Sequence, residues 1–458
     1  MSGSGVKGRL INVLNDKKQP LWNNIAAMIL VAAVGLSLFA CGRTEGAPSN
    51  SSSQGDVSGI SQATYTTEYI CVKISGISAS NLFNPSDAFK ITDLRAVAYI
   101  DSTIKAGKPS KQEGDPESNN TGRYMIELSN KTGGYSCELH YDTLYNKAYM
   151  IKDGSRFDIG TDFARYIDSL FGNKNISFNI DETDAALFKQ YGWTLAYQIR
   201  ERKDKLSDIN TLLGFNPNAY YFAYNNELSK DIGLDMSPYA DKNIDVKIYR
   251  ILESLPKEFS PSRDCRGIVV KSGGKIIGAF VSAGRHSAFN ACSLKGNSFE
   301  TVTGKTLDEW LVNKVQADGA EEKLSKSDPE QVIREYLTAL EKKDAKSAVY
   351  CLSKKMLLEY LTVNMPNDEL YNNVMVLPLA DADIGAKSAF ENLKSAKLLK
   401  IEPTGKLDES TETFRVDVNL LYNKMVTNEN GEQSWDCRMV YESPQTGWKI
   451  ESFGQGGY

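Results

Sequence analysis

The hydrophobic pattern divides the chain into one continuous apolar run near the N-terminus and a long remainder in which apolar and polar residues alternate. The run covers residues 25–40, carries no charge and is followed directly by Cys41. A membrane-spanning helix needs about 20 apolar residues, so the run is of marginal length for a span and suits the apolar part of a signal sequence. Residues 1–24 carry four basic side chains and one acidic side chain. This bias predicts that they stay in the cytoplasm and that the chain beyond residue 41 is exported.

Two modes of attachment are consistent with this run. The residues Leu38-Phe-Ala-Cys41-Gly42 resemble a bacterial lipobox, in which a lipid on Cys41 would anchor the protein. Alternatively, residues 25–41 form an uncleaved transmembrane helix. Both hypotheses predict a protein of the cell membrane with most of the chain on the extracytoplasmic side. A helix buried in a soluble domain is the third interpretation, and the Ser- and Gly-rich residues 42–63, which have the composition of a flexible linker, argue against it.

Residues 64–180 predict a first small α+β domain. An N-cap signal at residues 84–87 favours a helix, or a helix and a strand, within residues 88–105. Phe163, Ile167 and Leu170 have helical spacing. Short runs of β-forming residues predict strands at residues 69–74, 124–128, 135–139 and 147–151.

Residues 181–315 predict a second α+β domain. Its clearest feature is a hairpin over residues 267–281, in which two apolar strands flank a Ser-Gly-Gly turn. Helices are predicted at residues 185–197, 207–213, 246–255 and 303–315. The aromatic run within residues 214–224 is interpreted as a core strand, with a sugar- or peptide-stacking surface as the alternative.

A charged linker is predicted at residues 316–326, and a third domain follows at residues 327–458. Asp328-Pro329 begins a helix, since Asp caps it and Pro occupies the first helical position. Shorter helices are expected at residues 344–352 and 355–361. Three antiparallel strands are then predicted, at residues 414–420, 435–441 and 448–453, separated by turns at residues 430–431 and 444–447. The whole exported part is therefore expected to be α+β.

Two segments resemble known families. Residues 6–22 and the apolar run after them resemble the juxtamembrane region of Gram-positive membrane metallopeptidase receptors, the relatives of β-lactam sensors. The protease of that family needs a His-Glu-x-x-His zinc helix, but His140 and His286 are the only histidines and neither lies in such a motif. The resemblance therefore implies a sensor part without its protease.

The third domain, with helices first and a curled antiparallel sheet ending in Gly-Trp-Lys-Ile-Glu-Ser, resembles the cystatin-like cone of the nuclear transport factor family. The similar branch is one of unknown function found in bacterial lipoproteins. Enzymes of that superfamily place Asp or His in the mouth of the cone, and no His follows His286. The resemblance therefore implies a domain without catalytic activity.

Six cysteines follow Cys41, two in each predicted domain, and an even number outside the cytoplasm permits disulfides. The possible disulfide cysteines are Cys71, Cys137, Cys265, Cys292, Cys351 and Cys437, and buried thiols are the alternative for all of them. Because no Cys-x-x-Cys occurs, neither a zinc ribbon nor a thioredoxin-type site is expected, and no metal or cofactor is predicted.

Candidate chemistry is concentrated in residues 282–292. Arg285 could bind a carboxylate or phosphate, and His286 could act as an acid or base or pair with Cys292 as a nucleophile. The structural alternative is a turn whose polar groups bind backbone, with Cys292 buried or bonded to Cys265. The acyl-enzyme motifs Ser102-x-x-Lys105 and Ser254-x-x-Lys257, with the strand motif at residues 271–273, are interpreted as chance matches in a Ser- and Lys-rich chain.

The leading functional hypothesis is a membrane-anchored extracytoplasmic binding or sensor protein without catalytic activity, with an unknown ligand. The alternatives are a cell-surface hydrolase or transferase that uses Arg285 and His286, and a purely structural envelope protein. The net charge of −5, which becomes more negative without the basic N-terminus, disfavours nucleic acid as a partner. The membrane, contacted through residues 25–41, is the expected partner.

Overall fold

The computed structural model describes residues 67–78, 88–110, 121–142, 147–171, 176–256, 259, 265–282, 291–364, 379, 389–425 and 428–455. All elements below belong to one compact unit, residues 63–457. Helices and several antiparallel sheets confirm the predicted α+β class. The apolar run at residues 25–40 lies outside the described residues, and within them no helix combines the length and apolarity that a bilayer span requires.

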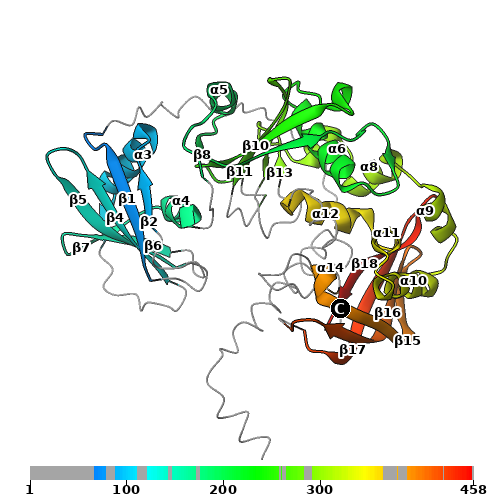
Figure 1. Ribbon diagram of the computed structural model, residues 1–458. Coiled ribbons are helices and arrows are strands. Elements are labelled where there is room, and N and C mark those ends of the chain that lie inside the picture. Colours follow the sequence, from blue (N-terminus) through cyan, green and yellow to red (C-terminus); the bar gives the residue numbers. More distant parts are fainter. Residues whose placement is uncertain are drawn as a thin grey trace, which may run out of the picture. The chain divides into compact units, whose positions relative to one another are not determined.

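The first sheet has seven strands in the order β2-β1-β4-β5-β6-β7-β3, with α3 packed on β1 and α4 packed on β5 and β6 (Figure 1). The elements are β1 (Cys71–Ser78), β2 (Ala88–Ile91), α3 (Leu94–Lys105), β3 (Lys108–Pro109), β4 (Thr121–Ser129), β5 (Gly134–Asp142), β6 (Lys147–Lys152), β7 (Ser155–Asp158) and α4 (Thr161–Phe171). Asp93 caps α3 by accepting from two backbone N–H groups, so the helix begins later than the signal at residues 84–87, which lies outside the described residues.

Alternation along β4 separates the core side chains from those on the opposite face of the sheet. On β4, Tyr124, Ile126 and Leu128 enter the core, whereas Arg123 and Met125 point to the opposite face. The predicted strands of this domain are confirmed, because period-two burial is the usual signature of a sheet covered by helices on one face.

The second sheet has five strands in the order β13-β12-β11-β10-β8. The elements are α5 (Glu182–Gln190), β8 (Leu195–Lys205), β9 (Leu212–Leu213), α6 (Pro217–Lys230), η1 (Ser237–Tyr239), β10 (Asn243–Ile251), β11 (Arg266–Ser272), β12 (Lys275–Ser282), β13 (Ala291–Cys292), α7 (Phe299–Thr303), α8 (Leu307–Lys314) and β14 (Val315–Gln316). The hairpin predicted at residues 267–281 is confirmed as β11 and β12.

Three helix predictions in this region are wrong in whole or in part. Residues 246–251 form strand β10, α5 ends at Gln190 before strand β8 begins, and residues 207–213 are not helical. Strand β10 is apolar on both faces, since Ile248 enters one core cluster and Tyr249 enters another. A strand buried on both faces loses the alternation by which strands are recognised.

The aromatic run is a helix, α6, and the prediction of a strand there is wrong. Asn216 caps it and Pro217 occupies its first position. Tyr220, Tyr221 and Tyr224 are all buried, because α6 contacts β12 and also α12 (Lys354–Asn364) of the C-terminal region. A helix that is buried all round shows no apolar stripe.

The C-terminal region contains helices followed by four antiparallel strands in the order β15-β16-β17-β18. Besides α12, its elements are α9 (Gly319–Leu324), α10 (Pro329–Glu341), α11 (Ala345–Tyr350), α14 (Ala389–Asn392), β15 (Leu393–Asp408), β16 (Thr411–Tyr422), β17 (Gly431–Ser443) and β18 (Gly447–Gly454). The predicted capped helix and the three predicted strands are present, with a capping box between Asp328 and Gln331. Strand β15 was not predicted, and most of its residues are exposed.

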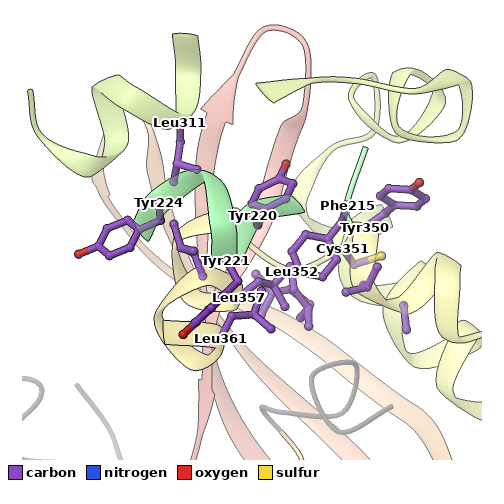
Figure 2. Packing of buried hydrophobic residues seen from close by; sticks show 14 of the residues in the cluster. Phe215, Tyr220, Tyr221, Tyr224, Leu311, Tyr350, Cys351, Leu352, Leu357 and Leu361 are labelled. Carbon is purple, nitrogen blue, oxygen red and sulfur yellow. The ribbon is translucent and has the colours of Figure 1, made fainter. Parts of the chain in front are cut away.

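The predicted linker at residues 316–326 is instead an ordered connection. Strand β14 pairs in parallel with β9, and the side chain of Glu321 in α9 has no exposed surface. A single hydrophobic cluster extends from Leu206 to Phe453, and Figure 2 shows its centre, where residues of α6, α11 and α12 meet. The second and third predicted domains therefore share one core.

Candidate functional site

The residues predicted as a ligand site, Arg285 and His286, and the predicted lipid anchor Cys41 lie outside the described residues. Of the neighbouring candidates, Cys292 is fully buried on β13 and Cys265 is buried directly before β11. Strand β12 lies between these two strands. The Cα atoms of Cys265 and Cys292 are therefore two strand spacings, or about 10 Å, apart. A disulfide requires a Cα–Cα distance below about 7 Å, so these two cysteines cannot be bonded to each other.

The other possible disulfide cysteines are also thiols in the structure. On β4, the partner of Cys71 is Ser129 and the partner of Cys137 is Ile126. Positions three apart on a strand face opposite sides of the sheet, so Cys71 and Cys137 cannot meet.

Cys351 and Cys437 are both buried in the C-terminal core. The Cys351 thiol donates to the Ser347 carbonyl at 3.5 Å, and the Cys437 thiol donates to the Met439 sulfur at 3.7 Å. Burial raises the pKa of Cys351 to about 12. Since the thiolate is the reactive form, the Cys351 thiol is unreactive at neutral pH.

A row of polar side chains crosses the first sheet on the face opposite its core. The strand register places Arg123 of β4 beside His140 of β5, His140 beside Tyr149 of β6, and Tyr149 beside Asp158 of β7. We call Arg123, Glu138, His140, Tyr149 and Arg156 the polar row. Only 2% of His140 is exposed, so its neighbours in the row largely enclose it.

The planar groups of the polar row are stacked. The ring centroids of His140 and Tyr149 are 4.4 Å apart at an interplanar angle of 14°. The guanidinium carbon of Arg156 lies 3.7 Å from the centroid of the Tyr149 ring. Because β6 lies between β5 and β7, the Tyr149 ring separates the imidazole from the guanidinium. Such stacking fixes the orientation of all three side chains.

Glu138 organises the other side of the row. One carboxylate oxygen, Oε1, accepts from Arg123 Nε at 2.6 Å and lies 3.0 Å from His140 Nε2. The second imidazole nitrogen, Nδ1, is 3.0 Å from the Tyr149 hydroxyl. When His140 Nε2 carries the proton, Nδ1 accepts from the Tyr149 hydroxyl. His140 is therefore held between the Glu138 carboxylate and the Tyr149 phenol.

Arg156 is the cation of this row that remains available to a ligand. No carboxylate among the described residues pairs with its guanidinium, and its Nε is buried without a hydrogen-bond partner in that set. The sequence pattern alone does not single out the polar row. A usable signal was present: His140 lies between the apolar residues Leu139 and Tyr141 at the end of a predicted strand, and alternation places it on the face opposite theirs.

A second ionic cluster attaches helix α5 to the second sheet. Lys271 Nζ lies 2.8 Å from Asp181 Oδ2 and 2.7 Å from Asp184 Oδ1. The Tyr249 hydroxyl donates to Asp184 at 2.7 Å, and the hydrogen bond from Lys271 holds the pKa of Asp181 well below its usual range. Lys271 belongs to the strand motif at residues 271–273, and these carboxylates already neutralise it. Ser102 lies in α3, the helix packed on β1 of the first sheet.

The second sheet also carries an open surface hollow of about 490 Å³. Its lining residues are Lys203, Asp204, Asn243, Ile244, Asp245 and Gly273. Asp204 is engaged by Arg202 and accepts from Asn218 at 3.1 Å. Among the residues that the structure describes, no group of three or more His, Cys, Asp or Glu side chains is arranged to hold a metal ion.

Comparison with known proteins places two segments of the chain. Residues 187–281 match the model "Domain of unknown function (DUF4830)", which runs from the end of α5 to β12. Residues 330–454 match "Domain of unknown function (DUF4829)", which covers α10 to β18. Neither description names the metallopeptidase receptors or the nuclear transport factor family, and the search of curated proteins found no match. The chain is thus similar to one domain of unknown function over its second sheet and to another over its C-terminal region.

Proposed function

We propose that this chain is a membrane-anchored extracytoplasmic binding protein, and that the polar row of the first sheet binds an anionic group of its ligand. The anchor rests on the apolar run and on the lipobox-like residues that end in Cys41. A sensor role rests on the juxtamembrane resemblance to metallopeptidase receptors. The observation that carries the binding function is the guanidinium of Arg156, which is stacked on Tyr149 and has no acidic partner among the described residues.

Charge supports an anionic ligand. Glu138 neutralises Arg123, so the cation left for an anionic ligand is Arg156, with Asp158 two positions along the same strand. Arg binds carboxylate and phosphate groups through paired donors. Because stacking already restricts Arg156 and Tyr149, little side-chain entropy is lost when an anion binds.

The test is titration calorimetry of the full chain in detergent, with inorganic phosphate, acetate and citrate as probes. Hydrogen bonds to charged groups contribute about 1.5–3 kcal/mol, so Arg156→Ala is expected to weaken binding by roughly 10- to 150-fold, and Arg156→Lys by less. Lys73→Ala, on the same sheet in an exposed pair with Glu127, serves as the control and should bind like the unmodified chain. Equal affinity in Arg156→Ala and the unmodified chain, or no binding of any probe, would refute the proposal.

The competing proposal, a cell-surface hydrolase or transferase, uses Arg285 and His286. It predicts a turnover that His286→Ala abolishes, whereas the binding hypothesis predicts unchanged anion affinity in that variant. Attachment is tested separately by labelling cells with palmitate. A lipoprotein incorporates label that Cys41→Ala loses, and a signal-anchor protein incorporates none.

A further inference from the structure

Three ionised side chains in the C-terminal region are completely buried together. Glu321 of α9, Lys354 of α12 and Lys449 of β18 each have no exposed side-chain surface. Both ammonium groups contact the same carboxylate oxygen, Glu321 Oε1, with Lys449 Nζ at 3.0 Å. Lys449 Nζ also donates to the Tyr350 carbonyl at 2.6 Å. The amine of Lys449 is therefore held in one place beside the Glu321 carboxyl group.

A second acid completes the cluster. Glu442 Oε1 accepts from the backbone N–H of Lys354 at 2.7 Å. The other oxygens of both acids, Glu321 Oε2 and Glu442 Oε2, are buried and find no hydrogen-bond partner among the described residues. Two cations and the Glu321 carboxylate are thus removed from water together with one oxygen of the partly exposed Glu442, and the penalty for burying each ion is several kcal/mol. Two carboxylate oxygens without donors leave that penalty only partly offset.

We propose that Lys449 and Glu321 form an intramolecular amide bond in the folded protein. The bond would convert one ammonium and one carboxylate into a neutral amide. It would leave one cation, Lys354, and one anion, Glu442, so the cluster keeps zero net charge. Groups that a fold holds in reacting position behave as if at very high concentration, and the absence of exposed surface on both side chains keeps bulk water away from the bond.

The reaction balances with water as the only by-product. The Lys449 nitrogen, after losing a proton, attacks the Glu321 carboxyl carbon and forms the C–N bond. The ammonium of Lys354 on Oε1 stabilises the negative charge that develops there. The C–Oε2 bond breaks, and Oε2 leaves as water with two protons that come from the Lys449 ammonium. The free carboxylate oxygen of Glu442 is the buried base that can carry these protons.

The lowered pKa of Lys449 supports its role as the nucleophile. Burial, together with the charge of Lys354, lowers the pKa of Lys449 to about 8. At pH 7 about one amine in ten would then be neutral, and a neutral amine is the nucleophilic form. An amide here would join α9, which lies between the two matched segments, covalently to the last strand.

Peptide mass spectrometry of the full chain tests the bond directly. Trypsin cannot cleave after an acylated lysine, so the digest should contain residues 315–323 joined to residues 439–458, with a mass 18 Da below the sum of the two peptides. Lys449→Arg keeps the positive charge but lacks the primary amine, and it should yield only unlinked peptides. Glu442→Gln should lower the linked fraction at least tenfold in freshly made protein. Lys355→Arg is the control, because Lys355 is 37% exposed and pairs with Asp308, and it should leave the link intact.

Each outcome is decisive. Linked peptides whose fragment ions place the bond between Glu321 and Lys449 support the proposal. Unlinked peptides in the unmodified chain overturn it, whatever the variants show. A link from Glu321 to Lys354 instead would also overturn it, because the stated nucleophile would be wrong.

Discussion

Replacing Leu357 with Ala tests whether the second sheet and the C-terminal region form one cooperative unit. Leu357 lies in α12, is fully buried and belongs to the cluster that also contains Tyr221 of α6 (Figure 2). Helix α12 contacts α6, although the two helices belong to segments that match different families. If they share a core, a cavity made in α12 must destabilise α6.

The magnitude follows from the size of the cavity. A buried Leu→Ala change costs about 2–5 kcal/mol, and each 1.4 kcal/mol corresponds to a factor of ten in an equilibrium constant. Amides of α6 that exchange only when the shared core opens should therefore lose protection by roughly 30-fold to several thousand-fold. Leu399→Ala is the matched control, since Leu399 on β15 is 50% exposed, and such surface changes stay within about 0.5 kcal/mol.

Hydrogen exchange followed by mass spectrometry measures this effect. Peptides from α6 and from β16–β18 should lose protection together in Leu357→Ala and remain unchanged in Leu399→Ala. If the C-terminal strands exchange faster while α6 keeps its protection, the two regions unfold separately and the inference of a shared core is wrong.

Three further predictions concern single groups. Asp181→Ala removes the cap of α5 and a partner of Lys271, so it should lower the free energy of unfolding by at least about 1–2 kcal/mol, which is typical of a lost cap. Urea unfolding measures this change, with the exposed Glu182→Ala as the control. Because the pKa of Asp181 is lowered, its contribution is present above its unfolded value of 3.8 and should fade as pH drops below about 4. Gly447→Ala places a Cβ 2.5 Å from the Ser325 Cα at a φ of +72°, and should lower Tm more than Gly154→Ala, which has a similar φ of +73° and open space; equal shifts would show that backbone strain alone acts. Burial raises the pKa of Cys351 from 9.0 to about 12, so the stability it contributes below pH 9 should decline between pH 9 and 12, and Cys351→Ala should flatten that part of a pH–stability curve.

Local chemistry predicted the elements in which one face is buried or a cap is explicit. The hairpin at residues 267–281 and the helix after Asp328 depend on turn and cap residues that act within a few positions. Strand β10 and helix α6 were predicted as the wrong element, because neighbours on both sides bury them and erase the periodicity. The core membership of the aromatic run was right, and only its secondary structure was wrong.

The sequence by itself determined the α+β class and the positions of the capped helices and tight turns. Only the tertiary structure decided which polar groups meet. Glu321 and Lys449 are 128 positions apart, and the polar row is assembled from strands β4 to β7 by their register. Residue type reveals that a side chain can be charged, whereas its partner, its burial and hence its chemistry depend on which distant segments pack against it.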